Sequence, residues 1–207
     1  MPSIYDLKPR FQALLRPMNQ ALVDHGVTAN AVTLAATVGS LLVGGAIALS
    51  PASAAPLLLM PVWLFVRMAL NAIDGMLARE HQMQSPLGAV LNEMGDVVSD
   101  VALYLPLALV PGLPPQTVVL VVIVGIMVEM IGVVSVQIGA SRRYDGPFGK
   151  SDRAFAFGLI CLLLGAGVSP AVWSDLMLWL MLGLSLLTLF NRGRRALAER
   201  GTDLDHA

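Results

Sequence analysis

Long apolar runs dominate this 207-residue chain and limit what it can fold into. They include AVTLAATVGSLLVGGAIAL, VALYLPLALV, TVVLVVIVGIMVEMIGVVSV and FAFGLICLLLGAGV. Charged residues make up 13% of the chain, whereas a typical soluble domain has about 25%. Because so few charges cannot cover a water-facing surface, the sequence predicts a membrane protein.

We expect six transmembrane helices. A helix rises about 1.5 Å per residue and must cross about 30 Å of hydrocarbon, so each span needs about 20 mostly apolar residues. Turns rich in Pro, Gly and Ser separate the runs, and Ser85 followed by Pro86 is typical of a helix start. The expected spans are residues 31–49, 55–80, 86–110, 117–140, 153–167 and 171–191.

The distribution of basic residues predicts the orientation in the membrane. Lys and Arg are retained preferentially on the cytoplasmic side. They precede the first span, close the second, occupy the loop between the fourth and fifth, and follow the sixth, whereas the three opposite turns contain none. Both termini are therefore expected in the cytoplasm, which agrees with an even number of spans.

Composition excludes several classes of function. A net charge of −1 argues against a nucleic-acid partner, and the single Cys161 excludes a disulfide framework and a cysteine metal site. The start of the chain lacks a basic region followed by an uninterrupted apolar run, so we expect no cleavable signal peptide.

We expect one domain with three parts. Apolar residues recur at helical spacing from Ile4 to Leu22, which predicts an amphipathic helix in residues 1–26 lying on the cytoplasmic membrane surface. A helix packed on the protein itself is the alternative interpretation. The six-helix bundle then covers residues 31–191, and residues 192–207 form a cytoplasmic tail.

Ionisable side chains within the expected spans need an explanation. Each costs about 3 kcal/mol on insertion scales, so five carboxylates would rival the whole stability of an ordinary domain, about 5–15 kcal/mol. They therefore need water, a cation or an arginine partner. The charged and amide residues of the second to fourth spans are Arg67, Asn71, Asp74, Asn92, Glu93, Asp96, Asp100 and Glu129.

Helical spacing places most of these residues on one face of the second span and one face of the third. The two spans are antiparallel, and if the two faces meet, their polar residues come level in the cytoplasmic half of the membrane. In that register Arg67 lies opposite Asp100, and we expect a structural ion pair. The remaining oxygen-rich cluster suits Mg²⁺, Mn²⁺ or Ca²⁺ and consists of Asn71, Asp74, Asn92 and Asp96.

The same residues resemble the signature of the CDP-alcohol phosphotransferase (CDP-alcohol phosphatidyltransferase) family, DGxxAR, eight residues, GxxxDxxxD. Residues 28–33, TANAVT, are also similar to the family's TPNxIT-like entry into the first span. Two of the family's four aspartates are Asn here, at positions 71 and 92. The matching positions are Asp74, Gly75, Ala78, Arg79, Gly88, Asn92 and Asp96.

The resemblance implies an enzyme that transfers a phosphatidyl or similar group from CDP-diacylglycerol, or a related CDP-lipid, to a small alcohol in phospholipid biosynthesis, releasing CMP. It also implies one or two Mg²⁺ or Mn²⁺ ions, the bacterial inner membrane with the site facing the cytoplasm, and a homodimer as an assembly frequent in the family. By this resemblance Asp96 is the general base. The implied metal ligands are Asn71, Asp74, Asn92 and Asp96, and the implied nucleotide and diphosphate contacts are Asn30, Thr33, Gly75, Ala78, Arg79 and Gly88.

A basic loop, SRRYDGPFGKSDR, lies on the same side as the expected site. One interpretation is an anion pocket for a phosphorylated acceptor such as glycerol 3-phosphate, with Arg142, Lys150 and Arg153 as the acceptor contacts. Membrane topology and contact with anionic lipid headgroups account for these charges equally well.

Two other functions stay open at this point. The two Asn substitutions lower the negative charge of the cluster and are compatible with a catalytically silent lipid- or nucleotide-binding relative. Intramembrane acids also occur in transporters, although polar groups there cross the whole membrane and here they gather in the inner half. We favour the enzyme because Asp74, Arg79 and Asp96, the charges hardest to replace, are retained.

Overall fold

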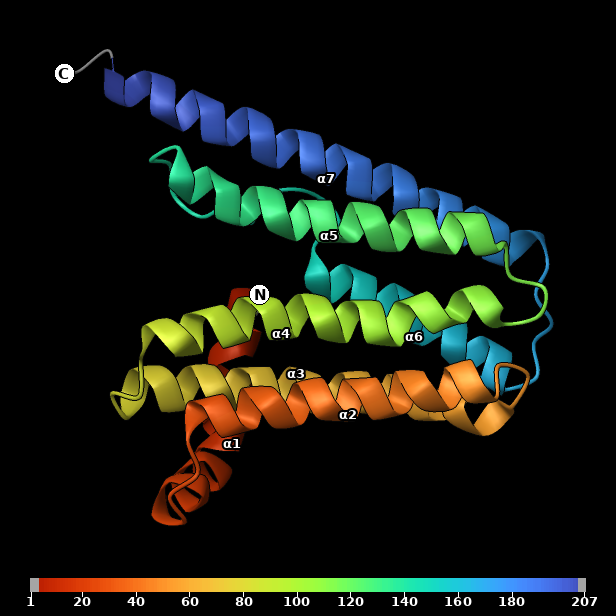
Figure 1. The fold of residues 1–207 in the computed structure, drawn as a ribbon, viewed down its shortest axis with the longest axis horizontal. Coiled ribbons are helices and arrows are strands. Elements are labelled where there is room, and N and C mark those ends of the chain that lie inside the picture. The colour runs from red at the N-terminus through yellow and green to blue at the C-terminus, as the bar shows by residue number, and fades with distance from the viewer. Residues whose placement is uncertain (1–3, 205–207) are drawn as a thin grey trace.

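The computed structural model describes residues 4–204, with side chains from residue 11 to residue 200, and every regular element in that range is a helix (Figure 1). After the first helix, six long helices run along the molecule. The elements are α1 (Ile4–Asp24), α2 (Ala29–Leu49), α3 (Ala54–Glu80), α4 (Pro86–Tyr104), the 3₁₀-helix η1 (Leu105–Leu109), α5 (Pro115–Gln137), α6 (Lys150–Gly165) and α7 (Val172–Leu204).

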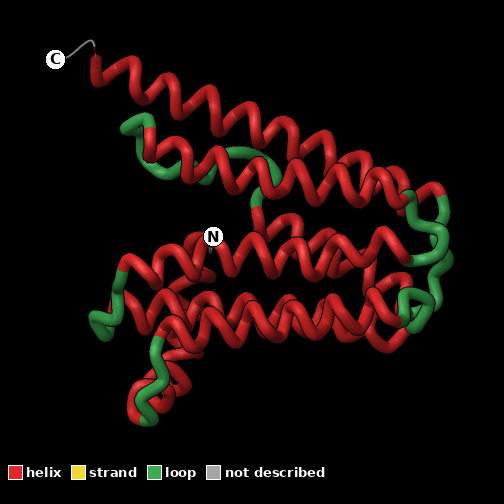
Figure 2. The backbone as a smooth tube through the Cα atoms, viewed as in Figure 1, coloured by secondary structure: helices red, strands yellow, loops and turns green. Residues whose placement is uncertain are grey.

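The connections gather at two ends of the bundle (Figure 2). The α2–α3, η1–α5 and α6–α7 connections lie at one end, on the right of the view. The α3–α4 turn, the start of the loop after α5 and the end of α7 lie on the left, where α1 crosses the bundle. Within the bundle, α2 packs against α3 and α4, α3 against α6, and α5 against α7.

Local sequence signals explain where several helices begin and end. Thr28 caps α2 by accepting a hydrogen bond from the Ala31 N–H at 3.2 Å, and Ser85 caps α4 by accepting one from Gly88 at 2.9 Å. The chain leaves α1 through Gly26, whose φ of +72° is a left-handed conformation that glycine adopts without steric cost.

Within the described part of the chain, four helices are long and apolar enough to cross a membrane, namely α2, α3, α5 and residues 172–200 of α7. The helix α6 has 16 residues, and α4 has 19 residues that include three carboxylates. The third expected span was one helix to Val110, but α4 ends at Tyr104 and continues as η1. Pro106 explains this difference, because proline has no N–H to donate and its ring clashes with the preceding turn.

The two ends of the chain refine the expected boundaries. The helix α7 continues to Leu204, so most of the expected tail is helical, while residues 1–3 and 205–207 lie outside the described range. In α1, Leu15 is buried with Phe11 and Leu22 against the α2–α3 side, whereas Leu14 is 79% exposed. The helix therefore packs on the protein with one face and presents an apolar edge outward with the other.

Candidate active site

A cavity of about 760 Å³ opens among α1, α2, α3 and α4, at the end of the bundle that carries the α3–α4 turn. The α3–α4 pair and the start of α2 together bring the signature residues other than Asp96 to its wall. The implied metal and nucleotide positions on this wall are Asn30, Thr33, Asn71, Asp74, Gly75, Ala78, Arg79, Gly88 and Asn92.

Two glycines make room for polar groups in this cavity. A Cβ atom added at Gly75 would lie 2.8 Å from Arg79 Nη2, and one added at Gly88 would lie 2.8 Å from Asn30 Oδ1. Both neighbours are side chains of the cavity and not the backbone of a packed helix. Small residues at these positions therefore let Arg79 and Asn30 reach the cavity.

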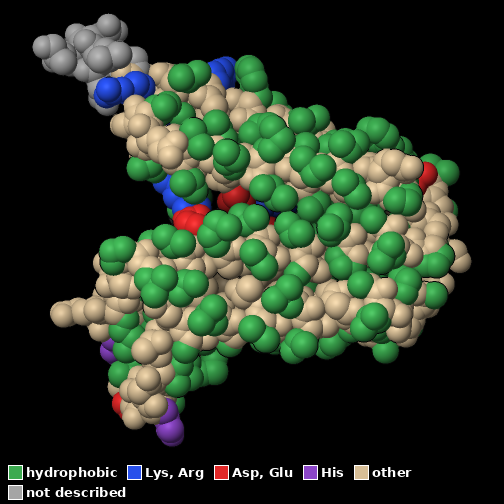
Figure 3. Space-filling model, in the orientation of Figure 1, with side chains coloured by type: hydrophobic (Ala, Val, Ile, Leu, Met, Phe, Trp, Pro, Cys, Tyr) green, Lys and Arg blue, Asp and Glu red, His purple; other side chains and the backbone are tan. Residues whose placement is uncertain are grey.

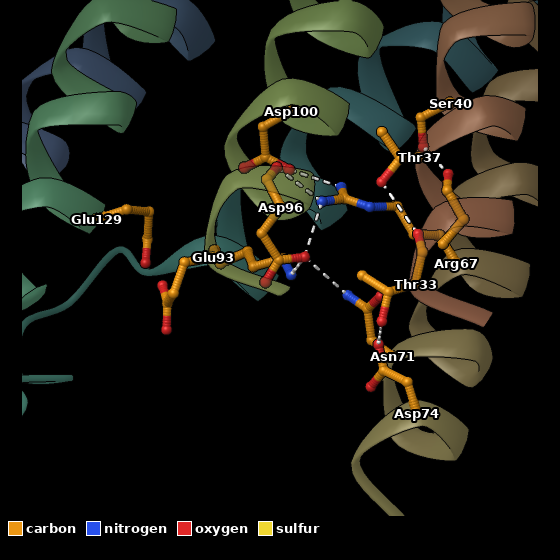
Figure 4. Close-up of polar contacts among 12 residues, drawn as sticks. Thr33, Thr37, Ser40, Arg67, Asn71, Asp74, Glu93, Asp96, Asp100 and Glu129 are labelled. Atoms are coloured by element: carbon orange, nitrogen blue, oxygen red, sulfur yellow. Dashed lines mark hydrogen bonds and ion pairs between the residues drawn. The ribbon is translucent and has the colours of Figure 1, made fainter. Parts of the chain in front are cut away.

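Asp74 is held from the neighbouring helix α2. The Thr33 hydroxyl lies 2.9 Å from Asp74 Oδ2 and donates a hydrogen bond to it, as Figure 4 shows. Asp74 is 6% exposed as a residue. Because a buried carboxylate needs hydrogen-bond donors, Thr33 fixes the orientation of the first aspartate of the signature.

Asp96 is surrounded by donors from α3 and α6. Its Oδ1 atom accepts hydrogen bonds from Asn71 Nδ2 at 3.2 Å and from Arg67 Nη2 at 3.3 Å. The Lys150 ammonium, at the start of α6, forms an ion pair with the same oxygen. These contacts fix the orientation of the Asp96 carboxylate between α3 and α6.

The structure contains the ion pair expected between Arg67 and Asp100. Arg67 Nη1 lies 2.6 Å from Asp100 Oδ1, and Arg67 is 3% exposed. Arg153 approaches the other carboxylate oxygen of Asp100 at 3.4 Å. The deepest charges of α3 and α4 thus compensate each other without a bound ion.

Carboxylates further from Asp74 also have basic partners. Glu129 on α5 pairs with Arg153 at 2.9 Å and with Arg192 on α7 at 3.7 Å, and Glu93 pairs with Arg142. Arg192 was not among the expected site residues. The sequence gives only an indirect signal for it, because an intramembrane glutamate needs a cation and arginines follow the sixth expected span.

Several side chains in this region carry oxygen atoms that are candidate ligands for a divalent cation. Within residues 11–200, no three Asp, Glu, His or Cys side chains come together as a metal site. A cation here would therefore use the carboxylates of Asp74 and Asp96 together with the amide oxygens of Asn71 and Asn92. Mg²⁺ and Mn²⁺ accept such oxygen ligands, so the residues fit the ion that the resemblance implies.

A second cavity, of about 500 Å³, lies between α3 and α6 and shares Asn71 with the first. Arg67 and Lys150 line its polar end, and most of its other residues, including Leu64, Phe65 and Leu162, are apolar. Figure 3 shows charged side chains in a hollow of the molecule whose outer face carries many hydrophobic side chains.

Comparison with known proteins connects this geometry to a family. The model of the family described as CDP-alcohol phosphatidyltransferase matches residues 26–189. The inner membrane protein YnbA of Escherichia coli strain K12 is 47% identical over 196 residues, which cover 94% of this chain and 96% of that protein.

Solved structures share the fold at low sequence identity. Mycobacterium tuberculosis phosphatidylinositol phosphate synthase (PgsA1) with CDP-DAG bound superposes with a TM-score of 0.73 and 19% identity, covering 87% of this chain and 92% of that chain. The same synthase in complex with manganese and citrate has a TM-score of 0.73 and 19% identity, covering 87% and 88% of the two chains.

Proposed function

The chain belongs to the CDP-alcohol phosphatidyltransferase family, and on this premise we propose that it transfers a phosphatidyl group from a CDP-lipid to a small alcohol and releases CMP. It is a membrane transferase of phospholipid biosynthesis. One observation supports a lipid-linked substrate in particular. Asn71 lines both the first cavity, among α1, α2, α3 and α4, and the mostly apolar second cavity between α3 and α6. A molecule with a nucleotide head and acyl chains would therefore fit the two cavities together.

The donor would bind with its nucleotide in the first cavity, among α1, α2, α3 and α4. Arg79 supplies a cation for a phosphate, and Gly75 and Gly88 leave room beside it. Asn30 and Thr33 reach the same space from α2. The related synthase crystallised with CDP-DAG supports this class of donor, with CDP-diacylglycerol as the first candidate.

A divalent cation would be held by Asp74 and Asp96 with help from Asn71 and Asn92. When bound, it would neutralise negative charge on the diphosphate of the donor. Two carboxylates balance the charge of one divalent ion, so we propose one Mg²⁺ or Mn²⁺ per site. The manganese complex of the related synthase supports the ion class.

Asp96 would act as the general base. The hydroxyl oxygen of the acceptor attacks the phosphorus that carries the lipid, the bond from this phosphorus to the bridging oxygen breaks, and CMP leaves. The proton of the hydroxyl passes to the Asp96 carboxylate. Arg67, Asn71 and Lys150 would orient that carboxylate through the contacts described above.

The cellular setting follows from the same comparisons. We propose an integral protein of the inner membrane with six spans and with the site facing the cytoplasm, supported by YnbA being an inner membrane protein and by the four long apolar helices. The basic residues of the α5–α6 loop support this orientation. A homodimer stays a prediction from the family resemblance.

Purified protein in lipid, supplied with CDP-diacylglycerol, a panel of alcohols and either Mg²⁺ or Mn²⁺, tests the proposal by CMP release. We expect Asp96→Asn to lower the rate by about 10²–10⁴-fold, the usual contribution of a general base. Asp175→Asn, an exposed position at the start of α7, is the control. If no CMP is released with any acceptor under either metal, the result favours the silent relative.

A further inference from the structure

We propose that the acceptor alcohol carries no phosphate or other net negative charge. This inference rests on the proposed function and names the acceptor class of the same site. It departs from the phosphorylated acceptor suggested by the basic loop, because the basic residues expected to bind it are already paired. The pairs are Lys150–Asp96, Arg142–Glu93, Arg153–Asp100 and Arg153–Glu129.

Arg153 illustrates why these pairs matter. It is 2% exposed and lies between Asp100 and Glu129. The hollow that it lines with Tyr104 has a volume of about 10 Å³, which is room for about one water molecule and too small for a phosphate group. A phosphate could reach this guanidinium only if the ion pairs separated.

Glu93 and Glu129 also form ion pairs with basic residues near Asp96. In Figure 4, Glu93 and Glu129 lie on the side of Asp96 away from Asn71 and Asp74. Glu93 pairs with Arg142, whose guanidinium also lies 5.1 Å from the ring centre of Tyr144, and Glu129 pairs with Arg192 at 3.7 Å. Any acceptor that reaches Asp96 from this side therefore meets carboxylates as well as cations.

The ion pairs of this region disfavour a second phosphate. Four carboxylates face five basic residues, and each of these basic residues already contacts at least one of the carboxylates. A phosphorylated acceptor would have to compete with Glu129 or Asp100 for a buried arginine, and separating an ion pair at this depth costs free energy. A neutral polyol instead forms hydrogen bonds with both partners and leaves the pairs intact. The five basic residues are Arg67, Arg142, Lys150, Arg153 and Arg192, and the four carboxylates are Glu93, Asp96, Asp100 and Glu129.

Matched acceptors test this inference. Glycerol is compared with glycerol 3-phosphate, and inositol with inositol phosphate, in the purified protein with CDP-diacylglycerol and Mg²⁺ or Mn²⁺. We expect kcat/KM for CMP release to be at least about tenfold higher with glycerol or with inositol than with the phosphorylated compound of the same pair. This corresponds to a difference of about 1.4 kcal/mol. Equal or faster reaction with the phosphorylated members overturns the acceptor class while supporting the transferase. If no CMP is released with any of the four acceptors, both the transferase and the acceptor class are overturned.

Variants of the two glutamates test the physical reason. Glu129→Gln and Glu93→Gln each remove a carboxylate that pairs with an arginine. We therefore expect each variant to raise the ratio of kcat/KM for the phosphorylated acceptor to kcat/KM for the unphosphorylated acceptor by about tenfold. Glu93 is 34% exposed in its side chain, so its variant remains informative even where Glu129→Gln fails to fold. Asp175→Asn is the control, because this exposed carboxylate lies at the start of α7, at the end of the bundle away from the site. An unchanged ratio in both glutamine variants contradicts the inference.

Discussion

At the scale of single residues, neutral side chains position the two retained aspartates. Thr33 donates to Asp74 and Asn71 donates to Asp96, so each carboxylate has a fixed donor from a neighbouring helix. Asn71 stands where the resembled family has an aspartate. Its amide Nδ2 gives Asp96 a donor that a carboxylate could not supply, while its Oδ1 remains able to accept a hydrogen bond or bind a cation.

Thr33→Val tests the support of Asp74. The change removes the hydroxyl but keeps the shape, so Asp74 loses a hydrogen bond to a charged group, worth about 1.5–3 kcal/mol. We expect kcat/KM for CMP release to fall by about tenfold or more. The control is Thr37→Val one turn further along α2, because that hydroxyl bonds only to the Thr33 carbonyl of its own helix among the bonds described. Equal losses in both variants would indicate a general effect on α2.

At the scale of helices, close packing of α2 against α4 aligns the two walls of the nucleotide cavity. Gly44 lies directly against the Ala102 carbonyl, and the Trp63 indole of α3 donates to Ser40 of α2 at 3.0 Å. The small residues Ser40 and Gly44 on α2 therefore allow two neighbouring helices to approach closely. This packing places Thr33 and Asn30 opposite the signature residues.

Gly44→Ala and Gly45→Ala make a matched pair for this packing. A Cβ atom at Gly44 would overlap the Ala102 backbone, whereas one at Gly45 would meet nothing within 4 Å. We expect Gly44→Ala to destabilise the protein by about 1–3 kcal/mol through overpacking, and Gly45→Ala to be neutral or slightly stabilising. Thermal unfolding in detergent measures both. Equal stability of the two variants would contradict the close α2–α4 contact.

The loop after α5 is attached to α7 by ion pairs outside the membrane-spanning segments. Asp145 accepts a hydrogen bond from Arg143 at 2.6 Å and pairs with Arg195 at 2.5 Å. The hydrogen bond from Arg143 is the main cause that holds the pKa of Asp145 below its usual range. The loop leads into Lys150, so its attachment also positions the cation that contacts Asp96.

The lowered pKa of Asp145 predicts a pH dependence of stability. Its contribution is fully present above the unfolded pKa, about 3.9, and is lost as the pH falls through the lower pKa of the folded state. We expect Asp145→Asn to lower the melting temperature by a few degrees at pH 7, because the pair is partly screened by solvent. The difference from the unchanged protein should vanish at low pH. A difference that persists there would mean that the effect of the variant does not depend on the charge of Asp145.

At the scale of the whole molecule, the site and the opposite connections lie at different ends of the bundle. The α2–α3 connection is at the end away from the α3–α4 turn and the loop after α5. If the bundle crosses the inner membrane as proposed, these two ends face different compartments. The orientation can therefore be measured with two cysteines.

Labelling of spheroplasts with a membrane-impermeant maleimide tests the orientation. In a Cys161→Ser background, which removes the buried native thiol, we expect Ala52→Cys in the α2–α3 connection to react from outside. Tyr144→Cys, at a position 70% exposed in the loop after α5, should react only after the membrane is permeabilised. The reverse pattern would place the site on the periplasmic side.

Much of the fold and part of the site were predictable because they depend on local patterns. Apolar runs and turn residues located the starts of the six long helices within a few residues, and helical spacing placed Arg67 opposite Asp100. The last helix, α7, continues to Leu204, well beyond the expected end at residue 191. The end of α4 at Tyr104 was missed, although Pro106 gave a local signal for it. The pairing of Glu129 with Arg192 had no such signal, because it depends on which helices become neighbours.

The sequence by itself determined the membrane class, the helices and the oxygen-bearing faces of α3 and α4, since hydropathy and a period of 3.6 residues act within one segment. Only the tertiary structure decided how the charges around Asp96 are shared. Lys150, Arg153 and Arg192 come from α6 and α7, and their partners are set by how these helices pack against α4 and α5. Charge pairing between distant segments follows from that packing, because each pair forms only where two helices meet.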